Sequence, residues 1–263
     1  MDLGLATAKV LVTAASQGLG AATARQFSLE GALVVINSRN LGELQATASK
    51  INEESTNPVY TLASDVSDPS AVEKLVRNAA DMLGGLDILV TNAGGPPNGT
   101  FEDFDIAAWQ KATELSLISA VGLVRAALPY LRKSKRAAIL AVVSASAKQP
   151  SKNNTLTNAI RPAVVGLMKT LSQELAADGI RANSILPGSI STGRQVEIMD
   201  ARAKKNSTTA EQEWERAAAD IPMGRFGTPE EFANVAVFLC SPAGGFINGV
   251  ALPVDGGRIR ATM

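Results

Sequence analysis

The chain alternates short β-branched and aliphatic runs with longer helical segments throughout its length. We predict strands at 9–13, 32–37, 58–62, 86–91, 137–143, 181–186 and 250–253, and helices near 18–30, 41–54, 69–83, 105–133, 156–177 and 228–239. The segment Leu33-Val34-Val35-Ile36 is apolar at every position, as expected when helices cover both faces of a parallel sheet. The pattern therefore predicts an α/β fold, with residues 1–263 forming a single doubly wound, Rossmann-type domain around a seven-stranded parallel sheet.

Residues 192–222 interrupt this alternation. The segment is charged, with Lys204-Lys205 and three glutamates at 211, 213 and 215, and it contains no strand pattern. We expect it to form a helical insertion that acts as a lid over the substrate.

Composition excludes several classes of partner. Lys and Arg together number 25, as do Asp and Glu, so no basic excess indicates a nucleic-acid or membrane-surface partner.

The first residues lack the pattern of a secretory signal, and the apolar runs, such as 137–143, are too short to span a bilayer. A single cysteine, Cys240, fits a reducing cytosol, so a cytoplasmic location is predicted. The absence of histidine disfavours a zinc site, and no metal is expected.

A glycine-containing turn lies between the first predicted strand and the first helix. Glycines here let the backbone approach a pyrophosphate, which the amides and dipole of the helix N-terminus then bind. Such a pair of glycines alone is often only a tight turn, but its position after the first strand favours a dinucleotide site. The turn reads Thr13-Ala14-Ala15-Ser16-Gln17-Gly18-Leu19-Gly20.

The end of the second predicted strand indicates which dinucleotide binds. NAD sites place an acid there to bind the ribose 2′-hydroxyl, but this chain has Asn37-Ser38-Arg39-Asn40. Ser38 and Arg39 can instead bind a 2′-phosphate, the arginine through a charge-assisted contact. NADP(H) is therefore predicted over NAD(H), the alternative being that Arg39 is a solvated loop charge.

The chain also contains Thr91-Asn92-Ala93-Gly94 after the fourth predicted strand, the pair Asp65-Val66, the segment Pro187–Thr192, and Pro222–Glu231 followed by Val254–Gly257. Together with the glycine-rich turn, these motifs resemble the classical short-chain dehydrogenase/reductase family nearly from end to end. In that family the position of Asp65-Val66 meets adenine, and the motif at Pro187–Thr192 binds the carboxamide end of the cofactor. The glycine-rich motif of the family is present with Ala14 in place of its first glycine, which puts a methyl group where the turn calls for a positive φ. The resemblance implies a cofactor site formed by Thr13, Ala15, Ser16, Gly18, Leu19, Gly20, Ser38, Arg39, Asp65, Val66, Asn92, Ala93, Gly94, Arg161, Pro187, Gly188, Ile190 and Thr192.

The resemblance also implies a catalytic Asn–Ser–Tyr–Lys tetrad, of which this chain keeps only the serine, Ser144. The tyrosine position is Thr157, the lysine position is Arg161 and the asparagine position is Ser116. An alkyl hydroxyl is far less acidic than a phenol, whose pKa is about 10, and an arginine with a pKa above about 12 cannot relay protons. We therefore expect proton transfer, rather than cofactor binding, to be impaired.

Several alternatives are open for the altered tetrad. A desolvated Lys148 or Lys152 could supply the missing acid, although solvated loop lysines are the ordinary case. Arg161 could bind the cofactor ribose, clamp a substrate carboxylate or phosphate, or pair with a nearby acid. Ser144 either donates a hydrogen bond to the substrate or only ends its strand.

The favoured reading is an NADP(H)-dependent oxidoreductase acting on a small-molecule carbonyl/alcohol pair, with 3-oxoacyl compounds as one candidate class. One alternative is a nucleotide-binding but catalytically silent scaffold or sensor, and another is an enzyme that uses the cofactor without net redox chemistry. The resemblance further implies a homo-oligomer, a tetramer or dimer, and the many apolar positions of helices 105–133 and 156–177 agree with it.

Overall fold

A computed structural model describes residues 1–262 and contains a seven-stranded, fully parallel sheet. All seven predicted strands are present, in the order β3-β2-β1-β4-β5-β6-β7, which confirms the doubly wound fold. The strands are β1 (Lys9–Val12), β2 (Leu33–Ser38), β3 (Val59–Ala63), β4 (Ile88–Thr91), β5 (Ala138–Val142), β6 (Arg181–Pro187) and β7 (Ala251–Val254).

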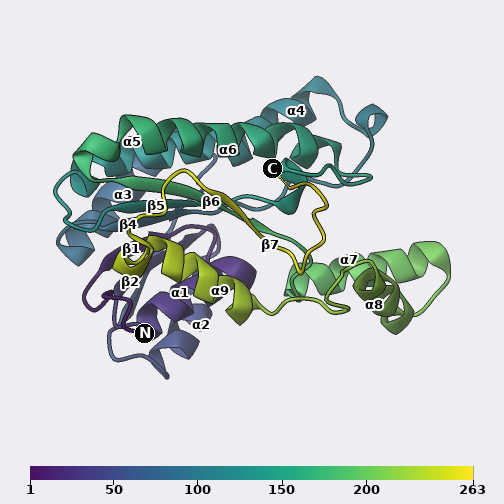
Figure 1. Cartoon of the computed structure of the whole chain (residues 1–263), viewed down its shortest axis with the longest axis horizontal. Helices are drawn as coiled ribbons and strands as arrows, with labels where there is room; N and C mark the ends of the chain where they lie inside the picture. Colours follow the sequence, from purple (N-terminus) through teal and green to yellow (C-terminus); the bar gives the residue numbers. More distant parts are fainter. Residues whose placement is uncertain (263) are drawn as a thin grey trace.

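Helices cover both faces of the sheet (Figure 1). One face carries α1 (Gly18–Leu29), α2 (Leu41–Asn52) and α9 (Pro229–Cys240), and the other carries α3 (Pro69–Leu83), α5 (Ser119–Leu131) and α6 (Thr155–Glu174). Successive side chains of β1 therefore enter different cores: Val10 packs in the same cluster as Phe27 of α1, whereas Leu11 packs in the cluster that contains Leu123 of α5. This two-sided burial explains why the strands are apolar at every position.

The helix predicted near 105–133 is present as Ile106–Leu131, and a π-helical turn lies within it. The segment consists of α4 (Ile106–Thr113), the π turn Glu114–Ile118 and then α5. At the end of the π turn the amide of Ser119 donates to the carbonyl of Glu114, five residues earlier. A π turn inserts one extra residue into a helix and is common at functional sites. Here the turn contains Ser116, one of the predicted tetrad positions.

The helix Ile106–Leu131 is long and apolar enough, by length and composition, to cross a membrane. Core helices of globular proteins meet the same criterion, and Leu123, Val124 and Leu131 of this helix are buried in the second core cluster. The apolar character of the helix is thus explained in part by the sheet that it covers.

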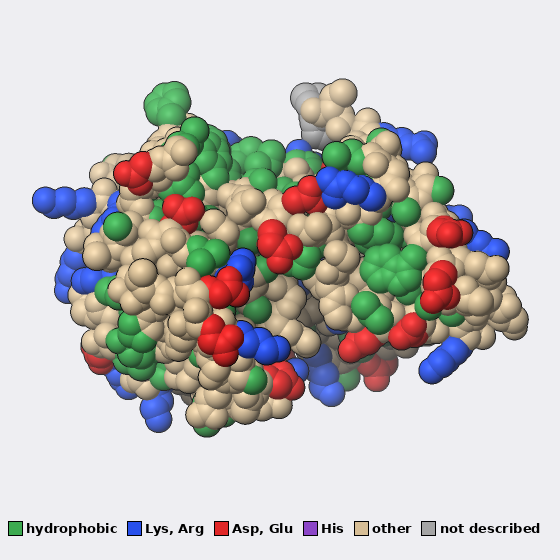
Figure 2. Space-filling view, turned by 90° about the horizontal axis from the view of Figure 1, so that it is seen from below, with side chains coloured by type: hydrophobic (Ala, Val, Ile, Leu, Met, Phe, Trp, Pro, Cys, Tyr) green, Lys and Arg blue, Asp and Glu red, His purple; other side chains and the backbone are tan. Residues whose placement is uncertain are grey.

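Two helices occupy the segment predicted as a lid, α7 (Gly193–Asn206) and α8 (Ala210–Ala219), and both project beyond the sheet (Figure 1). The buried carboxylate of Glu213 on α8 joins them by accepting hydrogen bonds from Thr208, Asn206 and Arg216. Seen from below, the surface is hollowed where this projection meets the body of the molecule (Figure 2).

Candidate active site

The ends of β1 and β4, which lie next to each other, are joined by hydrogen bonds. The hydroxyl of Thr13 donates to the carbonyl of Asn92 (2.7 Å) and accepts from its amide (2.9 Å). The Asn92 side chain donates to the carbonyl of Ala14 at 3.1 Å. Chain connections diverge between these strands, and ligands of open parallel sheets bind at the carboxyl ends of strands at such a switch point. Thr13 and Asn92 thus hold the two binding loops against each other.

The glycine-rich turn has the geometry of a phosphate cradle. Gly18 has a φ of 58°, and Ala14 is itself left-handed at 47°, so the strain predicted for its methyl group is present. A methyl group on Gly20 would lie 2.3 Å from the Ala14 carbonyl oxygen, which shows that only glycine permits this approach. Gln17, the N-cap of α1, provides no side-chain cap, so within the described chain the first amides of α1 are left for an anion.

Three of the residues predicted to hold the adenosine end lie close together. Arg39 is 80 % exposed and forms a long ion pair (4.0 Å) with Asp65, while the adjacent Val66 is buried. The Ser38 hydroxyl accepts from the amide of Asn40 (3.3 Å). The guanidinium of Arg39 is thus free to exchange an exposed carboxylate for a phosphate.

Sequence reasoning missed one acid at this end of the site, Glu43. The hydroxyl of Ser16, in the glycine-rich turn, donates to the Glu43 carboxylate at 3.2 Å. Glu43 lies in the first turn of α2, after the N-cap Asn40, where acids are common because they favour the helix dipole. Its proximity to the glycine-rich turn depends on how α2 packs, and no local pattern reveals it.

The segment after β6 lies over the glycine-rich turn. The amide of Gly188 donates to the Val254 carbonyl (2.9 Å), and a methyl group on Gly188 would lie 2.5 Å from the Asp255 side chain. Ile190 is buried, and Thr192 is the N-cap of α7 with its methyl group 3.8 Å from the position of a Cβ on Gly18. Pro187 ends β6 directly before these residues. The predicted carboxamide-binding residues therefore face the turn predicted to bind the pyrophosphate.

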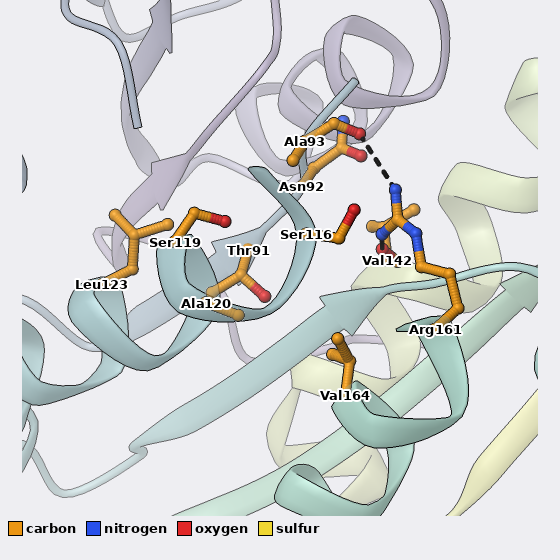
Figure 3. A pocket seen from close by; sticks show the side chains of 10 residues that line it. All are labelled: Thr91, Asn92, Ala93, Ser116, Ser119, Ala120, Leu123, Val142, Arg161 and Val164. Carbon is orange, nitrogen blue, oxygen red and sulfur yellow. Dashed lines mark hydrogen bonds between the residues drawn. The ribbon is translucent and has the colours of Figure 1, made fainter. Parts of the chain in front are cut away.

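Arg161 occupies the centre of the predicted catalytic site (Figure 3). It is 5 % exposed, and its guanidinium donates to the carbonyls of Val142 (3.1 Å), Ala93 (3.4 Å) and Gly94 (3.4 Å). Burial, aided by the nearby charge of Arg194, lowers the pKa of Arg161 to about 10, so the group is still protonated at neutral pH. Among residues 1–262 it forms no ion pair, so the predicted alternative of pairing with a nearby acid is wrong.

A small cavity separates Arg161 from Ser116 and is shown in Figure 3. Its volume is about 10 Å³, which is close to the minimum for one water molecule. Ser116 Oγ and Arg161 Nε are both buried without a hydrogen-bond partner in the described chain, and both residues line the cavity. Buried polar groups are costly when unsatisfied, so this cavity is suited to a single bridging water. The π turn thus places Ser116 beside Arg161.

The remaining predicted residues lie around the end of β5. Ser144 is half-buried and its hydroxyl accepts from the amide of Ser146 (3.1 Å), which supports a strand-ending role but leaves its proton free to be donated. Thr157 is buried one helical turn before Arg161, on the same face of α6. Lys148 and Lys152 are both exposed, so the hypothesis that either is a desolvated acid is wrong for this conformation.

The described residues contain no group of three or more Cys, Asp or Glu side chains arranged to hold a metal ion. The polar groups around the end of β5 are the hydroxyls of Ser144 and Thr157 and the guanidinium of Arg161. The open glycine-rich turn, next to the uncapped first amides of α1, has the shape and the donors to fit the phosphate of a dinucleotide. No heavy atom lies within 4 Å of the position that a Cβ on Gly94 would take, so the loop after β4 leaves room for a ligand.

Comparison with known proteins identifies the family. Residues 13–258 match the family model described as enoyl-(acyl carrier protein) reductase. The chain is 32 % identical, over 94 % of its length and 95 % of the relative, to an uncharacterised oxidoreductase of Mycobacterium bovis. L-Sorbose reductase from Gluconobacter frateurii, solved with NADPH and L-sorbose, superposes with a TM-score of 0.95 at 34 % identity, covering 99 % of this chain and 100 % of the reductase.

A further solved relative is a short-chain oxidoreductase from Pseudomonas aeruginosa PAO1 that contains an atypical catalytic centre. It has a TM-score of 0.91 and 32 % identity, with 98 % of this chain and 100 % of that chain covered. The fold, the nicotinamide-nucleotide motifs and these matches agree throughout the chain. This protein is an oxidoreductase that belongs to the short-chain dehydrogenase/reductase family.

Proposed function

We propose that the protein is an NADP(H)-dependent oxidoreductase of a carbonyl/alcohol pair, with 3-oxoacyl compounds as one candidate substrate class. The observation that carries the NADP(H) preference is the exposed guanidinium of Arg39 at the end of β2, held only by a 4.0 Å ion pair. A 2′-phosphate offers this arginine a stronger, bidentate contact than Asp65 does. NADPH in the sorbose reductase structure supports the proposal by analogy.

The nicotinamide cofactor would supply hydride transfer, and the chain would bind it through the α1 amides, Asn92–Gly94 and the Gly188–Thr192 segment. The hydroxyls of Ser144 and Thr157 would hydrogen-bond the carbonyl oxygen, and the protonated Arg161 would add a favourable field. None of these groups is a strong acid at neutral pH, so water would provide the proton. Positioning alone can lower the barrier by about 7–11 kcal/mol, which makes a slow reductase physically reasonable.

Arg39→Ala tests the cofactor proposal. Loss of the phosphate contact is expected to weaken NADPH binding by about 1.5–3 kcal/mol, which is roughly 10- to 150-fold, and to leave NADH binding unchanged. Nicotinamide fluorescence and calorimetry measure both affinities. Glu43→Gln removes the negative charge beside Ser16 and should strengthen NADPH binding. Lys50→Ala, also on α2, serves as the neutral control. Equal affinities of the wild type for NADPH and NADH would contradict the proposal.

A catalytically silent, nucleotide-binding protein is the second candidate. The fixed position of Arg161 favours it, because both terminal nitrogens of the guanidinium already donate to backbone carbonyls and are held away from a substrate oxygen. A screen of aldehydes and ketones with saturating NADPH separates the candidates: turnover above the uncatalysed rate supports the enzyme, and tight binding without turnover of any carbonyl supports the silent protein. Cofactor use without net redox would instead give product with no change in NADPH absorbance.

We also propose that the protein is a cytoplasmic homo-oligomer, a tetramer or a dimer. Ile118, between α4 and α5, is 42 % exposed although it belongs to an otherwise apolar helix, and such surplus apolar surface is typical of interfaces. Light scattering at micromolar concentration is expected to give a multiple of the 27.3 kDa monomer mass. A mass equal to that of the monomer would contradict the oligomer.

A further inference from the structure

Two arginines from different helices converge on the loop that follows β4. Arg161 of α6 donates to the carbonyls of Ala93 and Gly94 from the buried side. Arg194, in the first turn of α7, contacts the next residue: a methyl group on Gly95 would lie 3.1 Å from its Nη2 atom and 3.4 Å from its Cζ atom. The segment 93–95 therefore lies between two guanidinium groups.

No carboxylate compensates this pair of charges. Of the ion pairs formed among residues 1–262, none includes Arg161 or Arg194. The charge of Arg194 adds to burial in lowering the pKa of Arg161, which indicates that the two cations are close enough to repel each other. Arg161 is buried without a countercharge and the guanidinium of Arg194 is exposed beside it, so the two positive charges together favour an anion that the chain itself does not provide.

We propose that Arg194, with the field of Arg161 behind it, binds a carboxylate of the substrate, so that the substrate is an oxo acid and its product the hydroxy acid. The inference rests on the proposed function and specifies its substrate class. Arginine suits this role because its planar fork matches a carboxylate with two parallel hydrogen bonds. Gly94 and Gly95 are exposed and lack side chains, so they leave the space in front of Arg194 open.

The alternative source of an anion is the pyrophosphate of the cofactor, and the contacts favour the substrate. Thr192 and Gly193 lie over the glycine-rich turn, since a Cβ on Gly193 would be 4.0 Å from Gln17 Oε1. The next residue, Arg194, extends instead to Gly95, beyond the end of β4. The pyrophosphate also has its own donors in the first turn of α1, to which Gln17 provides no side-chain cap.

Arg194→Gln tests the inference, with Lys204→Gln as the matched control on the same exposed helix. Arg194 is exposed, so the variant is expected to fold. Calorimetry with oxalate and with pyruvate, on the cofactor-free protein and at saturating NADPH, should show saturable binding to the wild type. Binding should weaken about tenfold or more in Arg194→Gln, as for loss of a hydrogen bond to a charged group, and stay unchanged in Lys204→Gln. Methyl pyruvate, which lacks the negative charge, should bind with the same affinity to the wild type, Arg194→Gln and Lys204→Gln.

The affinities for NADPH and NADH, measured by fluorescence, separate the two sources of the anion. If both cofactors bind about tenfold more weakly to Arg194→Gln while carboxylate binding is retained, the arginine serves the pyrophosphate and the inference is overturned. The same holds if the wild type binds neither oxalate nor pyruvate. If carboxylates bind through Arg194 but no oxo acid is reduced, the anion site stands and the proposed oxidoreductase activity fails instead.

Discussion

Thr157→Tyr combined with Arg161→Lys is expected to raise the turnover of an activated ketone by about 10²-fold, the lower range of general acid catalysis. The variant places a phenol and an amine one helical turn apart on the same face of α6, where the wild type has an alkyl hydroxyl and a guanidinium. A phenol with a pKa near 10 next to an ammonium group becomes a better acid, because the cation favours its ionised form. NADPH affinity should change little, since the glycine-rich turn and Arg39 lie elsewhere.

The structure shows why both substitutions are needed together. The Arg161 guanidinium extends to the carbonyls of Val142, Ala93 and Gly94, and a shorter lysine leaves part of that volume vacant. A tyrosine at the buried position of Thr157 alone would add atoms to a packed site, at a typical cost of about 1–3 kcal/mol. The melting temperature should therefore be followed for the single and double variants.

Thr157→Phe with Arg161→Lys is the matched control, because it has the same ring without the hydroxyl. If the phenylalanine variant gains as much activity as the tyrosine variant, the gain comes from packing and the role assigned to the missing phenol is wrong. The rate of the tyrosine variant should also acquire a new pH dependence that the control lacks. Adding Ser116→Asn tests whether a longer polar side chain in the cavity beside residue 161 raises the rate further.

The sheet could be predicted because each strand carries its own signal. Segments such as β2 are apolar along their length, and the two-sided burial that causes this pattern is a property of the fold as a whole. The helix near 105–133 could be predicted but its π turn could not, because a π turn leaves the apolar pattern almost unchanged. The π turn places Ser116 beside the Arg161 side chain, and the periodicity of the helix does not predict that position.

The glycine-rich turn was predictable for a related reason. The Thr13–Gly20 turn needs glycine at defined positions, and its register relative to β1 and α1 is local. By contrast, Glu43 meets Ser16, and Arg194 meets Gly95, only because α2 and α7 pack onto distant segments. The sequence could place Arg161 on α6 near the site, but the carbonyls to which it binds belong to β5 and the loop after β4. The residue pattern therefore does not predict contacts between segments that lie far apart in the chain.

Gly20→Ala is expected to weaken NADPH binding by more than about 100-fold. The new methyl group would lie 2.3 Å from the Ala14 carbonyl oxygen and 2.9 Å from Ala15 Cα, and both are backbone atoms that cannot rotate away. The turn must shift, and the Ala14 carbonyl also accepts the hydrogen bond from Asn92, so the loop after β4 shifts with it. Misplacing two charge-assisted hydrogen bonds from the α1 amides, at about 1.5–3 kcal/mol each, accounts for the loss. Fluorescence titration with NADPH measures it.

Two other substitutions, one at a helix start and one in the glycine-rich turn, should stabilise the protein. Gly42→Ala, at the start of α2 with only an ordinary 3.5 Å contact, is expected to leave NADPH affinity unchanged and to stabilise the helix by about 0.5–1 kcal/mol. Ala14→Gly should stabilise the protein by a similar amount, about 0.5–1 kcal/mol, because it removes a left-handed alanine with a φ of 47°. Denaturant unfolding measures both changes. If Gly20→Ala bound NADPH as tightly as Gly42→Ala does, the close approach of α1 to the β1 turn would not be what forms the phosphate site.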